Sequence, residues 1–339
     1  MVRVGVIGCG NIGRVHAMSI KGLKGVSLCA VADIRMERAK EFSDCFTEGM
    51  AAVYGSLEEM LEKEALDVVH ICTPHNCHVP MTVMVLKKGI SAFMEKPPAI
   101  TRTQFDELLE AEKESSGRLG ICFQNRYNET TKKVSQILAE GTLGKLKGGR
   151  AFVTWNRGSA YYTESGWRGD LSTEGGGVLI NQSIHTLDLM LNWLGKPVKT
   201  EAAMSNHHLK GVIGVEDTME AYMEFTEGED PVRASFYATT AYGFDAPVLM
   251  ELVCEEGVVR LEGNSVFYRT WEQEDFVSWK APSALVPGKS YWGCGHEACI
   301  QDYYKCLADG TAYPNDLPSV KTTFYTMMDI YDSARNKER

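Results

Sequence analysis

The chain lacks long apolar runs and has little positive charge. No stretch of its 339 residues approaches the roughly 20 apolar residues that a membrane-spanning helix needs, although 44% of the residues are hydrophobic. Lys and Arg number 35 against 45 Asp and Glu, which gives a formal net charge of −10. This average charge would repel nucleic acids and anionic membranes. The composition therefore predicts a globular protein without either partner, and its length predicts two domains.

Cysteines are present, but the regular spacing of a disulfide framework is missing. The ten cysteines are scattered, and several lie in or beside apolar runs, as small buried hydrophobic side chains do. Cys294, His296 and Cys299 cluster as possible metal ligands, but no comparable local pair completes the set, so we predict no metal site. The apolar pattern begins at residue 2, which leaves no room for a signal peptide, and we expect a cytoplasmic protein with reduced thiols.

A glycine-rich loop lies between an apolar run at residues 2–7 and a helical pattern. A second apolar run, at residues 26–32, ends in Asp33. Gly8 allows a tight turn, Gly10 lets backbone amides approach a pyrophosphate, and Gly13 lets the helix pack closely on the strand. The helix N-terminus faces the diphosphate, and Asp33 accepts hydrogen bonds from ribose hydroxyls. The pattern predicts a dinucleotide site built from Gly8, Gly10, Asn11, Ile12, Gly13 and Asp33.

The residue at the end of the second strand decides which dinucleotide fits. A carboxylate bonds the 2′-hydroxyl of NAD and repels the 2′-phosphate of NADP, so Asp33 favours NAD. Arg35 could clamp a phosphate if Asp33 turned away, although a solvated residue in the first turn of the next helix is the plainer interpretation. We therefore predict NAD, with NADP as the alternative.

Short apolar strands alternate with helical patterns over residues 1–122. The predicted strands lie at residues 2–7, 26–32, 52–54, 67–72, 91–94 and 118–122. This alternation predicts an α/β dinucleotide-binding Rossmann domain with a doubly wound parallel sheet. Such sheets bind ligands beyond the carboxyl ends of their strands, where further cofactor-binding candidates are Arg35, Thr73, Pro74, His78, Glu95 and Lys96. Lys96 ends a buried strand and precedes a proline, although most lysines at strand ends are simply surface residues.

Residues 123–339 have a different pattern, with many strands and few helices between them. The predicted strands lie at residues 146–155, 198–204, 217–225, 232–238, 247–254, 258–261 and 266–271. They predict an α+β domain for substrate binding and oligomerisation, with a large, mostly antiparallel open sheet. Strands 232–238 and 247–254 have alternating apolar residues that need a partner surface, so we expect a homodimer or homotetramer. Two tail helices, at residues 297–307 and 321–335, can pack back on the first domain.

One helical stretch in the second domain carries polar residues at regular spacing. Asn181, His185 and Asp188 recur at steps of four and three, so they line one face of the helix. Leu187, Met190, Leu191 and Leu194 form an apolar stripe for the core. A polar stripe with a histidine beside an apolar stripe suggests a helix whose edge faces a cavity.

The ordered set of motifs resembles the family of oxidoreductases named for glucose–fructose oxidoreductase and inositol dehydrogenase, the Gfo/Idh/MocA family. The resemblance is collinear over essentially the whole chain, and its motifs are the glycine loop with His16, Thr73-Pro74 with His78, Glu95-Lys96-Pro97, Asn125-Arg126, Gly175-Gly176-Gly177, His185 with Asp188, and the tail helices. It implies that Lys96 and His185 work at the reacting carbon of a bound sugar. Asn125 joins the cofactor-binding candidates.

The implied chemistry is the oxidation of a secondary alcohol, in which a base must accept the hydroxyl proton. The imidazole of a histidine such as His185 titrates near neutral pH, and Lys96 could donate to the developing alkoxide or share the proton. Many family members have an aspartate where this chain has Asn181, which can orient a hydroxyl but cannot accept a proton. The substrate-binding candidates are Lys96, Arg168, Asn181, His185, Asn125, Tyr127, Trp155 and Tyr161.

The leading hypothesis is an NAD-dependent oxidoreductase that transfers a hydride between a sugar, cyclitol or related polyol and the nicotinamide. Two alternatives stay open, and both are known in this family or in similar folds. One is a non-catalytic, nicotinamide-dependent regulator, against which the retained Lys96 and His185 argue. The other is a glycosidase that uses tightly held NAD for transient oxidation. The sequence does not choose among the sugars and cyclitols.

Overall fold

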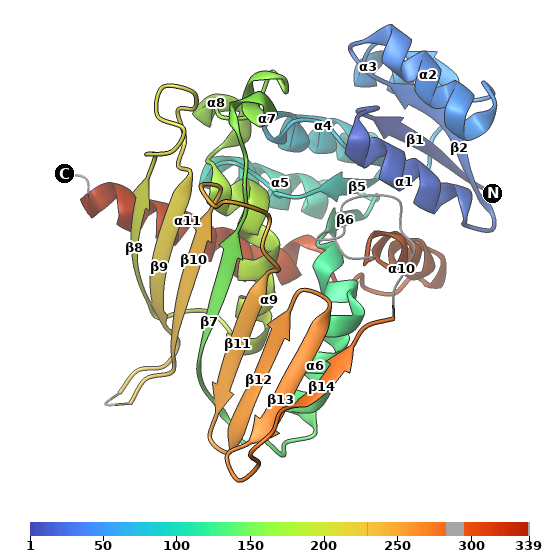
Figure 1. The fold of residues 1–339 in the computed structure, drawn as a ribbon. Coiled ribbons are helices and arrows are strands. Elements are labelled where there is room, and N and C mark those ends of the chain that lie inside the picture. Colours follow the sequence, from blue (N-terminus) through green and yellow to red (C-terminus); the bar gives the residue numbers. More distant parts are fainter. Residues whose placement is uncertain (229, 283–294, 338–339) are drawn as a thin grey trace. The chain divides into compact units, whose positions relative to one another are not determined.

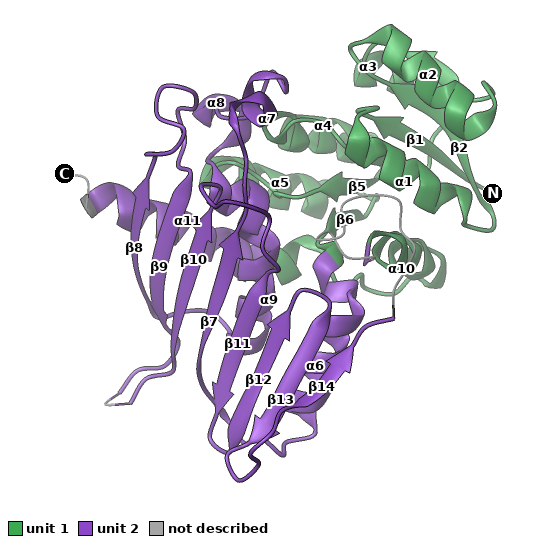
Figure 2. Ribbon diagram, viewed as in Figure 1, with its two compact units in different colours: residues 1–124, 296–320 green, residues 125–295, 321–339 purple. Residues whose placement is uncertain are grey.

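A computed structural model describes residues 1–228, 230–282 and 295–337, and the chain divides into two compact units (Figure 2). The first unit comprises residues 1–124 and 296–320, and the second comprises residues 125–295 and 321–339. The sequence places the boundary after residue 122. In the structure, nearly all of the first tail helix, α10 (Gly295–Asp309), belongs to the first unit.

The first unit is built on a six-stranded sheet with the order β3-β2-β1-β4-β5-β6 (Figure 1). Every pair of neighbouring strands is parallel, so the predicted doubly wound parallel sheet is confirmed. All residues of β4 are buried, as expected for a strand that helices cover on both faces. The strands are β1 (Val2–Ile7), β2 (Val26–Ala32), β3 (Ala52–Tyr54), β4 (Val68–Ile71), β5 (Ser91–Glu95) and β6 (Leu119–Cys122).

Helices connect the successive strands of this sheet. They are α1 (Asn11–Lys21), α2 (Met36–Thr47), α3 (Leu57–Lys63), α4 (His75–Lys87) and α5 (Arg102–Glu114). Local cap chemistry fixes where two of them start. The Ser56 hydroxyl accepts from the Glu59 N–H at the start of α3, and the Thr101 hydroxyl accepts from the Gln104 N–H at the start of α5.

The second unit is built on an eight-stranded sheet with the order β14-β13-β12-β11-β7-β10-β9-β8. Among its described strands only β7 and β10 pair in parallel, so the predicted large, mostly antiparallel sheet is confirmed. The strands are β7 (Leu146–Thr154), β8 (Lys199–Ser205), β9 (Thr218–Glu224), β10 (Arg233–Thr239), β11 (Leu249–Cys254), β12 (Gly257–Glu262), β13 (Ser265–Thr270) and β14 (Val277–Lys280). The edge strand β14 is missing from the sequence prediction; it has only four residues, and most of them are exposed.

The remaining helices belong mainly to the second unit. They are α6 (Glu129–Ala139), α7 (Ser159–Thr163), α8 (Leu171–Glu174), α9 (Ile184–Leu194) and α11 (Leu317–Lys337), with a 3₁₀ turn η1 (Gln124–Tyr127) and a π-turn η2 (Leu179–Ser183). Helices α6, α9 and α11 lie against one face of the eight-stranded sheet (Figure 1). Among the described residues, no helix has both the length and the apolar character to cross a membrane.

The expectation that the alternating apolar residues of β10 and β11 need a partner surface is wrong. Phe236 and Met250 are each 2% exposed within the single chain. Both pair with Ala151 of β7, on the same face as Gly149, which lies beside Leu194 of α9. The apolar alternation therefore marks the face that the chain's own helices cover.

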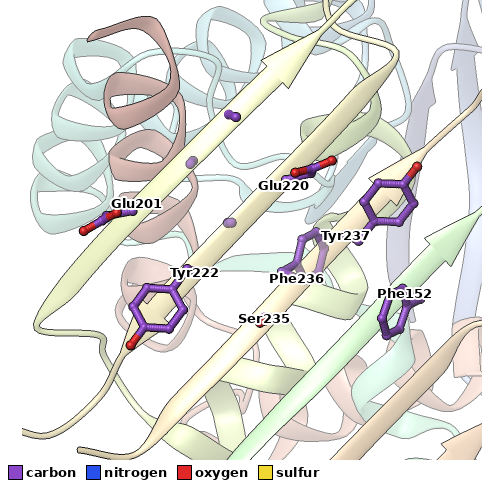
Figure 3. Close-up of a pocket in the computed structure, with 10 residues that line it drawn as sticks. Phe152, Glu201, Glu220, Tyr222, Ser235, Phe236 and Tyr237 are labelled. Carbon is purple, nitrogen blue, oxygen red and sulfur yellow. The ribbon is translucent and has the colours of Figure 1, made fainter. Parts of the chain in front are cut away.

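Among the described residues of the second unit, no helix covers the opposite face of this sheet (Figure 1). Phe152 and Tyr237 are half-buried, pair across β7 and β10, and have ring centroids 6.2 Å apart. With Tyr222 of β9 they border a hollow of about 390 Å³ (Figure 3). This face combines aromatic rings with the carboxylates of Glu201 and Glu220.

Candidate active site

The glycine loop of the first unit has room for a ligand at one of its three glycines. A Cβ atom at Gly8 would lie 2.4 Å from the Cys72 carbonyl oxygen, and one at Gly13 would lie 2.2 Å from the Gly8 carbonyl oxygen. The fold itself therefore requires these two glycines. At Gly10, which precedes Asn11 and Ile12 at the start of α1, no atom of the described residues lies within 4 Å of the Cβ position. Open space at this position suits the close approach of a pyrophosphate.

Asp33 is held firmly beside this loop. Its carboxylate is 6% exposed and accepts hydrogen bonds from the N–H groups of Cys9, at 3.0 Å, and Arg35, at 2.9 Å. The two oxygens have acceptor sites left for ribose hydroxyls. The Arg35 side chain is exposed, whereas Arg38, which sequence reasoning missed, lies 3.8 Å from the carboxylate. The sequence could have indicated Arg38, because Arg35 caps the start of α2 and Arg38 follows it three residues later, on the same side of that helix.

Two further loops at the carboxyl edge of the sheet are linked by His78. Its Nδ1 lies 2.9 Å from the Pro97 carbonyl oxygen and its Nε2 lies 2.9 Å from the Thr73 carbonyl oxygen. Burial lowers the pKa of His78, so the ring is neutral and donates to one carbonyl at a time. His78 thus spans the loop of Thr73 and Pro74 and the loop that follows Lys96.

The Thr73 hydroxyl gives a second indication of a ligand. Its oxygen is buried and has no hydrogen-bond partner among the residues that the structure describes. Buried hydroxyls normally have a partner, so a bound molecule at this loop would satisfy the group. Together with the space at Gly10 and the anchored Asp33, this shows that the residues present fit a dinucleotide.

Glu95, the residue before Lys96, is a buried carboxylate at the end of a hydrogen-bond chain. It accepts from His16 Nε2 at 3.0 Å, His16 Nδ1 lies 2.9 Å from His70 Nδ1, and His70 Nε2 lies 2.9 Å from the Tyr304 hydroxyl on α10. Burial alone would raise the pKa of Glu95, but the hydrogen bond from His16 and the charges of His16, His296 and Lys96 hold it below its usual range. Glu95 is therefore ionised beside the half-buried Lys96.

Two residues of this hydrogen-bond chain, His16 and Glu95, are also possible metal ligands. His16, Glu95 and Cys122 place possible ligand atoms within 4.8 Å of one another. Both ring nitrogens of His16 already lie within hydrogen-bond distance of Glu95 and His70. A metal ion there would have to replace one of these contacts. Of the cluster considered in the sequence, Cys294 lies outside the described residues, and burial lowers the pKa of His296 to about 4.

In the second unit, Asp188 fixes the helix that carries His185. The Asp188 carboxylate is 1% exposed and binds Arg126 of η1 through two hydrogen bonds, of 2.7 and 2.6 Å. It also accepts from the Thr323 hydroxyl of α11 at 2.7 Å. Asp188 is thus an anchor, whereas His185 and Asn181 on the same face are half-buried. Asn125 and Tyr127 belong to the anchored η1 turn and are also half-buried.

The π-turn η2 precedes α9 and contains Asn181. Single π-turns within helices are rare and often occur at functional sites. Asn181 donates from its Nδ2 to the carboxylate of Glu174, and Gln182 donates to the Tyr161 hydroxyl at 3.2 Å. Sequence reasoning missed Glu174, because nothing in the sequence separates it from the exposed acidic residues nearby.

Guanidinium groups and aromatic rings alternate next to this turn. Arg168 lies 4.4 Å from the Tyr161 ring centroid and 4.8 Å from that of Trp167. Arg157 lies 5.1 Å from Trp155 and 5.4 Å from Tyr161. The structure therefore brings Tyr161, Arg168 and, through Arg157, Trp155 into one cluster, and Asn181 joins it through its neighbour Gln182, which donates to Tyr161. Trp155 is 7% exposed, and its indole N–H already donates to a backbone carbonyl, so it has little surface for a ligand.

An open glycine loop beside an anchored carboxylate, at the carboxyl edge of a doubly wound sheet, defines a dinucleotide-binding protein. The chain belongs to the GFO/IDH/MocA family of oxidoreductases. The family description "Oxidoreductase family, NAD-binding Rossmann fold" matches residues 2–123, and "GFO/IDH/MocA C-terminal domain" matches residues 131–260. The predicted family and the predicted NAD-binding domain are confirmed.

Several named relatives are dehydrogenases. The chain is 29% identical over 244 residues to a D-glucoside 3-dehydrogenase of Escherichia coli, covering 71% of this chain and 67% of the relative. It is 26% identical over 230 residues to a myo-inositol 2-dehydrogenase of Thermotoga maritima, covering 67% of this chain and 66% of the relative. These alignments span about two thirds of each relative's own length.

Solved structures share the fold. The WlbA dehydrogenase from Bordetella pertussis, in complex with NADH and UDP-GlcNAcA, has a TM-score of 0.84 at 24% identity, with 99% of this chain and 97% of that chain covered. An oxidoreductase from Agrobacterium radiobacter, in complex with NAD+, L-tartaric acid and magnesium, has a TM-score of 0.86 at 19% identity, with the same two coverages. At these identities the likeness establishes the fold.

Proposed function

We propose that this protein uses NAD to oxidise a secondary alcohol of a sugar, cyclitol or related polyol, and that it catalyses the reverse reaction. The observation that carries the proposal is the pairing, in each unit, of one half-buried proton-handling residue with a fixed carboxylate. Lys96 follows the buried, ionised Glu95, and His185 lies one turn before the anchored Asp188. The relatives named as glucoside and inositol dehydrogenases support the substrate class.

The residues of the first unit would hold the cofactor. The backbone amides at Gly10, Asn11 and Ile12 would bind the diphosphate, Asp33 would bind the ribose hydroxyls, and the hydroxyl of Thr73 would gain its missing partner. Bound NAD would supply the hydride acceptor. Of the remaining cofactor candidates from the sequence, Pro74, His78 and Glu95 would shape this site rather than carry its chemistry, and Asn125 of the second unit stays a candidate from the sequence.

The protein's own groups would handle the proton. We assign His185 as the base that takes the hydroxyl proton on a ring nitrogen, because an imidazole works in both directions near neutral pH. Lys96 Nζ would donate a hydrogen bond to the oxygen as negative charge develops on it. Arg168, Asn181 and Tyr161 would orient the other hydroxyls of the substrate, since they lie in one cluster with partly exposed side chains.

The direct experiment is a panel of sugars, sugar acids and inositols with NAD, read at the absorbance of NADH. The proposal expects NADH to form with at least one member. A protein that binds NAD but gives no absorbance change with any polyol would be a regulator. Cofactor that survives purification, together with cleavage of glycosides and no net NADH, would identify the glycosidase alternative.

The preference for NAD is expected to depend on the charge of Asp33. Asp33→Asn keeps an acceptor for the Arg35 N–H but removes the negative charge, so we expect the ratio of NADP to NAD affinity to rise by about tenfold or more. The exposed Arg35 and the nearby Arg38 would then favour the 2′-phosphate. Fluorescence titration with NADH and NADPH measures both affinities. Glu37→Gln, at an exposed carboxylate of the same helix, is the matched control, and an unchanged ratio in Asp33→Asn would refute the assignment.

We also propose that the protein is a homodimer or homotetramer, joined through the open face of the eight-stranded sheet. The support is the partly exposed Phe152, Tyr222 and Tyr237 on a face that no described helix of the second unit covers. Tyr237→Arg should dissociate the assembly. The monomer should stay folded, because Glu220 lies opposite in the register and can pair with the arginine. Light scattering at micromolar concentration tests this, and a monomeric unaltered protein would disprove it.

A further inference from the structure

Glu174 is a fully buried carboxylic acid beside the predicted substrate residues. Its side chain is 0% exposed at the end of α8. The Gly169 N–H donates to Oε2 at 2.5 Å, and the Asn181 Nδ2 group donates to Oε1. A carboxylate that is shielded from solvent needs such donors. The Gly169 N–H can only donate a hydrogen bond. The Asn181 amide can turn to donate or to accept, depending on the charge of Glu174.

The contact with Glu174 fixes the orientation of the Asn181 amide. A planar amide carries its NH₂ group and its carbonyl oxygen on opposite arms. While the NH₂ arm faces the ionised Glu174, the Oδ1 arm is turned away from it. Asn181 then acts as a hydrogen-bond acceptor on the helix face that it shares with His185. One oxygen of an aspartate at this position would do the same.

We propose that Glu174 is a positioning residue of the active site: its ionised form holds Asn181 with the carbonyl oxygen as acceptor for His185 or a substrate hydroxyl, and its protonated form reverses the amide. The inference rests on the proposed function, because it gives Asn181 a role in that reaction. It also supplies the negative charge that Asn181 itself cannot carry.

Glu174 is suited to change its charge near neutral pH. Burial raises its pKa to about 7, and the charge of Glu216 adds to this, while the hydrogen bonds from Gly169 and Asn181 and the charge of Arg168 act in the opposite direction. The other titratable groups nearby are Glu216, whose pKa burial also raises, and the phenols Tyr162 and Tyr331, whose pKa burial raises above the ordinary value. Both phenols therefore stay neutral while Glu174 titrates.

Glu216 differs from Glu174 in the groups that donate hydrogen bonds to it. It is also buried, but it accepts from the N–H groups of Gly177 and Leu179, at 2.8 and 3.1 Å, and from the Tyr331 hydroxyl at 2.8 Å. These donors belong to the backbone and to α11, and none is a predicted substrate residue. Glu216 thus fixes the start of η2, whereas Glu174 controls a side chain within η2.

The variant Glu174→Gln should hold the Asn181 amide in the reversed orientation, as protonated Glu174 does. The Gly169 N–H requires an oxygen opposite it, so the NH₂ arm of the introduced glutamine would face Asn181, and Asn181 would have to accept with its own oxygen. We expect turnover to fall by about tenfold or more at pH 8, the size of one misdirected hydrogen bond to a charged group. Glu164→Gln, at an exposed carboxylate in the same segment, should leave turnover unchanged.

A rescue separates positioning from a purely structural role. Glu174→Gln combined with Asn181→Asp moves the carboxylate from position 174 to position 181. The introduced glutamine then donates its hydrogen bond to the introduced aspartate. The double variant should recover turnover to within a few-fold of the unaltered protein, measured with NAD and the best polyol of the panel. If it stays as slow as the single variant while both melt at the normal temperature, the proposal is wrong.

A measurement without turnover keeps the inference separate from the proposed function. With ¹⁵N-labelled asparagine, the side-chain amide signal of Asn181, assigned by its loss in Asn181→Asp, should shift with a midpoint near pH 7. The shift should persist in Glu164→Gln and vanish in Glu174→Gln. A shift without activity on any polyol would remove the proposed function and retain the switch. Activity without a shift would remove the switch alone.

Discussion

Replacement of Lys96 by alanine is expected to lower turnover by about a hundredfold or more and to leave the affinity for NAD nearly unchanged. A group that assists proton transfer typically contributes a factor of this size. Lys96 follows the buried, ionised Glu95, and the charge of Lys96 helps to lower the pKa of that carboxyl. Lys88→Ala, at an exposed lysine of the same unit, is the matched control and should have the normal rate.

His185→Ala should reduce turnover to a similar extent. If both residues serve one proton path, the double variant should be little slower than either single variant, because the second deletion removes a path that is already broken. Steady-state kinetics with saturating NAD, together with NAD affinity from fluorescence, measures these effects. Structural residues would behave differently: a packed histidine would give a less stable protein, and a surface lysine would give no phenotype. A Lys96→Ala protein of normal rate would rule out the proposed chemistry.

His16→Ala is expected to destabilise the first unit by about 3–5 kcal/mol. The change leaves the buried Glu95 carboxylate without its principal donor, and breaking a buried pair costs this much because a charge remains uncompensated. His16 is 0% exposed and Glu95 is 6% exposed, so bulk solvent has little access to the carboxylate in the folded protein. Urea unfolding followed by fluorescence gives the free energy.

Arg14→Ala is the matched control for that experiment. Arg14 also lies on α1 and pairs with Glu41 at 2.6 Å, but both side chains are partly exposed, so its loss should cost less than about 1 kcal/mol. The pH dependence gives a further check. Because the pKa of Glu95 is lowered in the folded protein, its contribution is complete above the ordinary carboxyl range and declines as the pH falls. The difference between His16→Ala and the unaltered protein should narrow as the pH falls below about 4, and equal costs for the two variants would contradict the buried charge.

Local patterns sufficed for the first unit's sheet and for its glycine loop. Gly8 and Gly13 could be predicted because a Cβ atom at either position would clash with the backbone, so the need for glycine is visible in the sequence. The contact between His70 and Tyr304 could not be predicted, because 234 residues separate them and neither belongs to a motif. Glu174 could not be predicted for another reason: its raised pKa depends on its burial, which the sequence does not show. The alternation of apolar residues in β10 and β11 correctly predicted that one face of these strands is covered. Such a pattern does not identify the covering surface, which here is formed by the chain's own helices.

The hydrogen bonds to residues 296–320 have a consequence for the order of folding. The Ile121 N–H of the edge strand β6 donates to the Asn315 carbonyl, and the Tyr303 hydroxyl donates to the Ala92 carbonyl at 3.0 Å. A ribosome releases residues 296–320 only after the whole eight-stranded sheet has been made. Residues 1–124 of the NAD-binding unit are therefore translated before the second sheet, but the unit cannot complete its hydrogen bonds until that sheet has been translated. A nascent chain that stalls within the second sheet would expose β6 and the rings around Phe93, which makes it a natural target for chaperones.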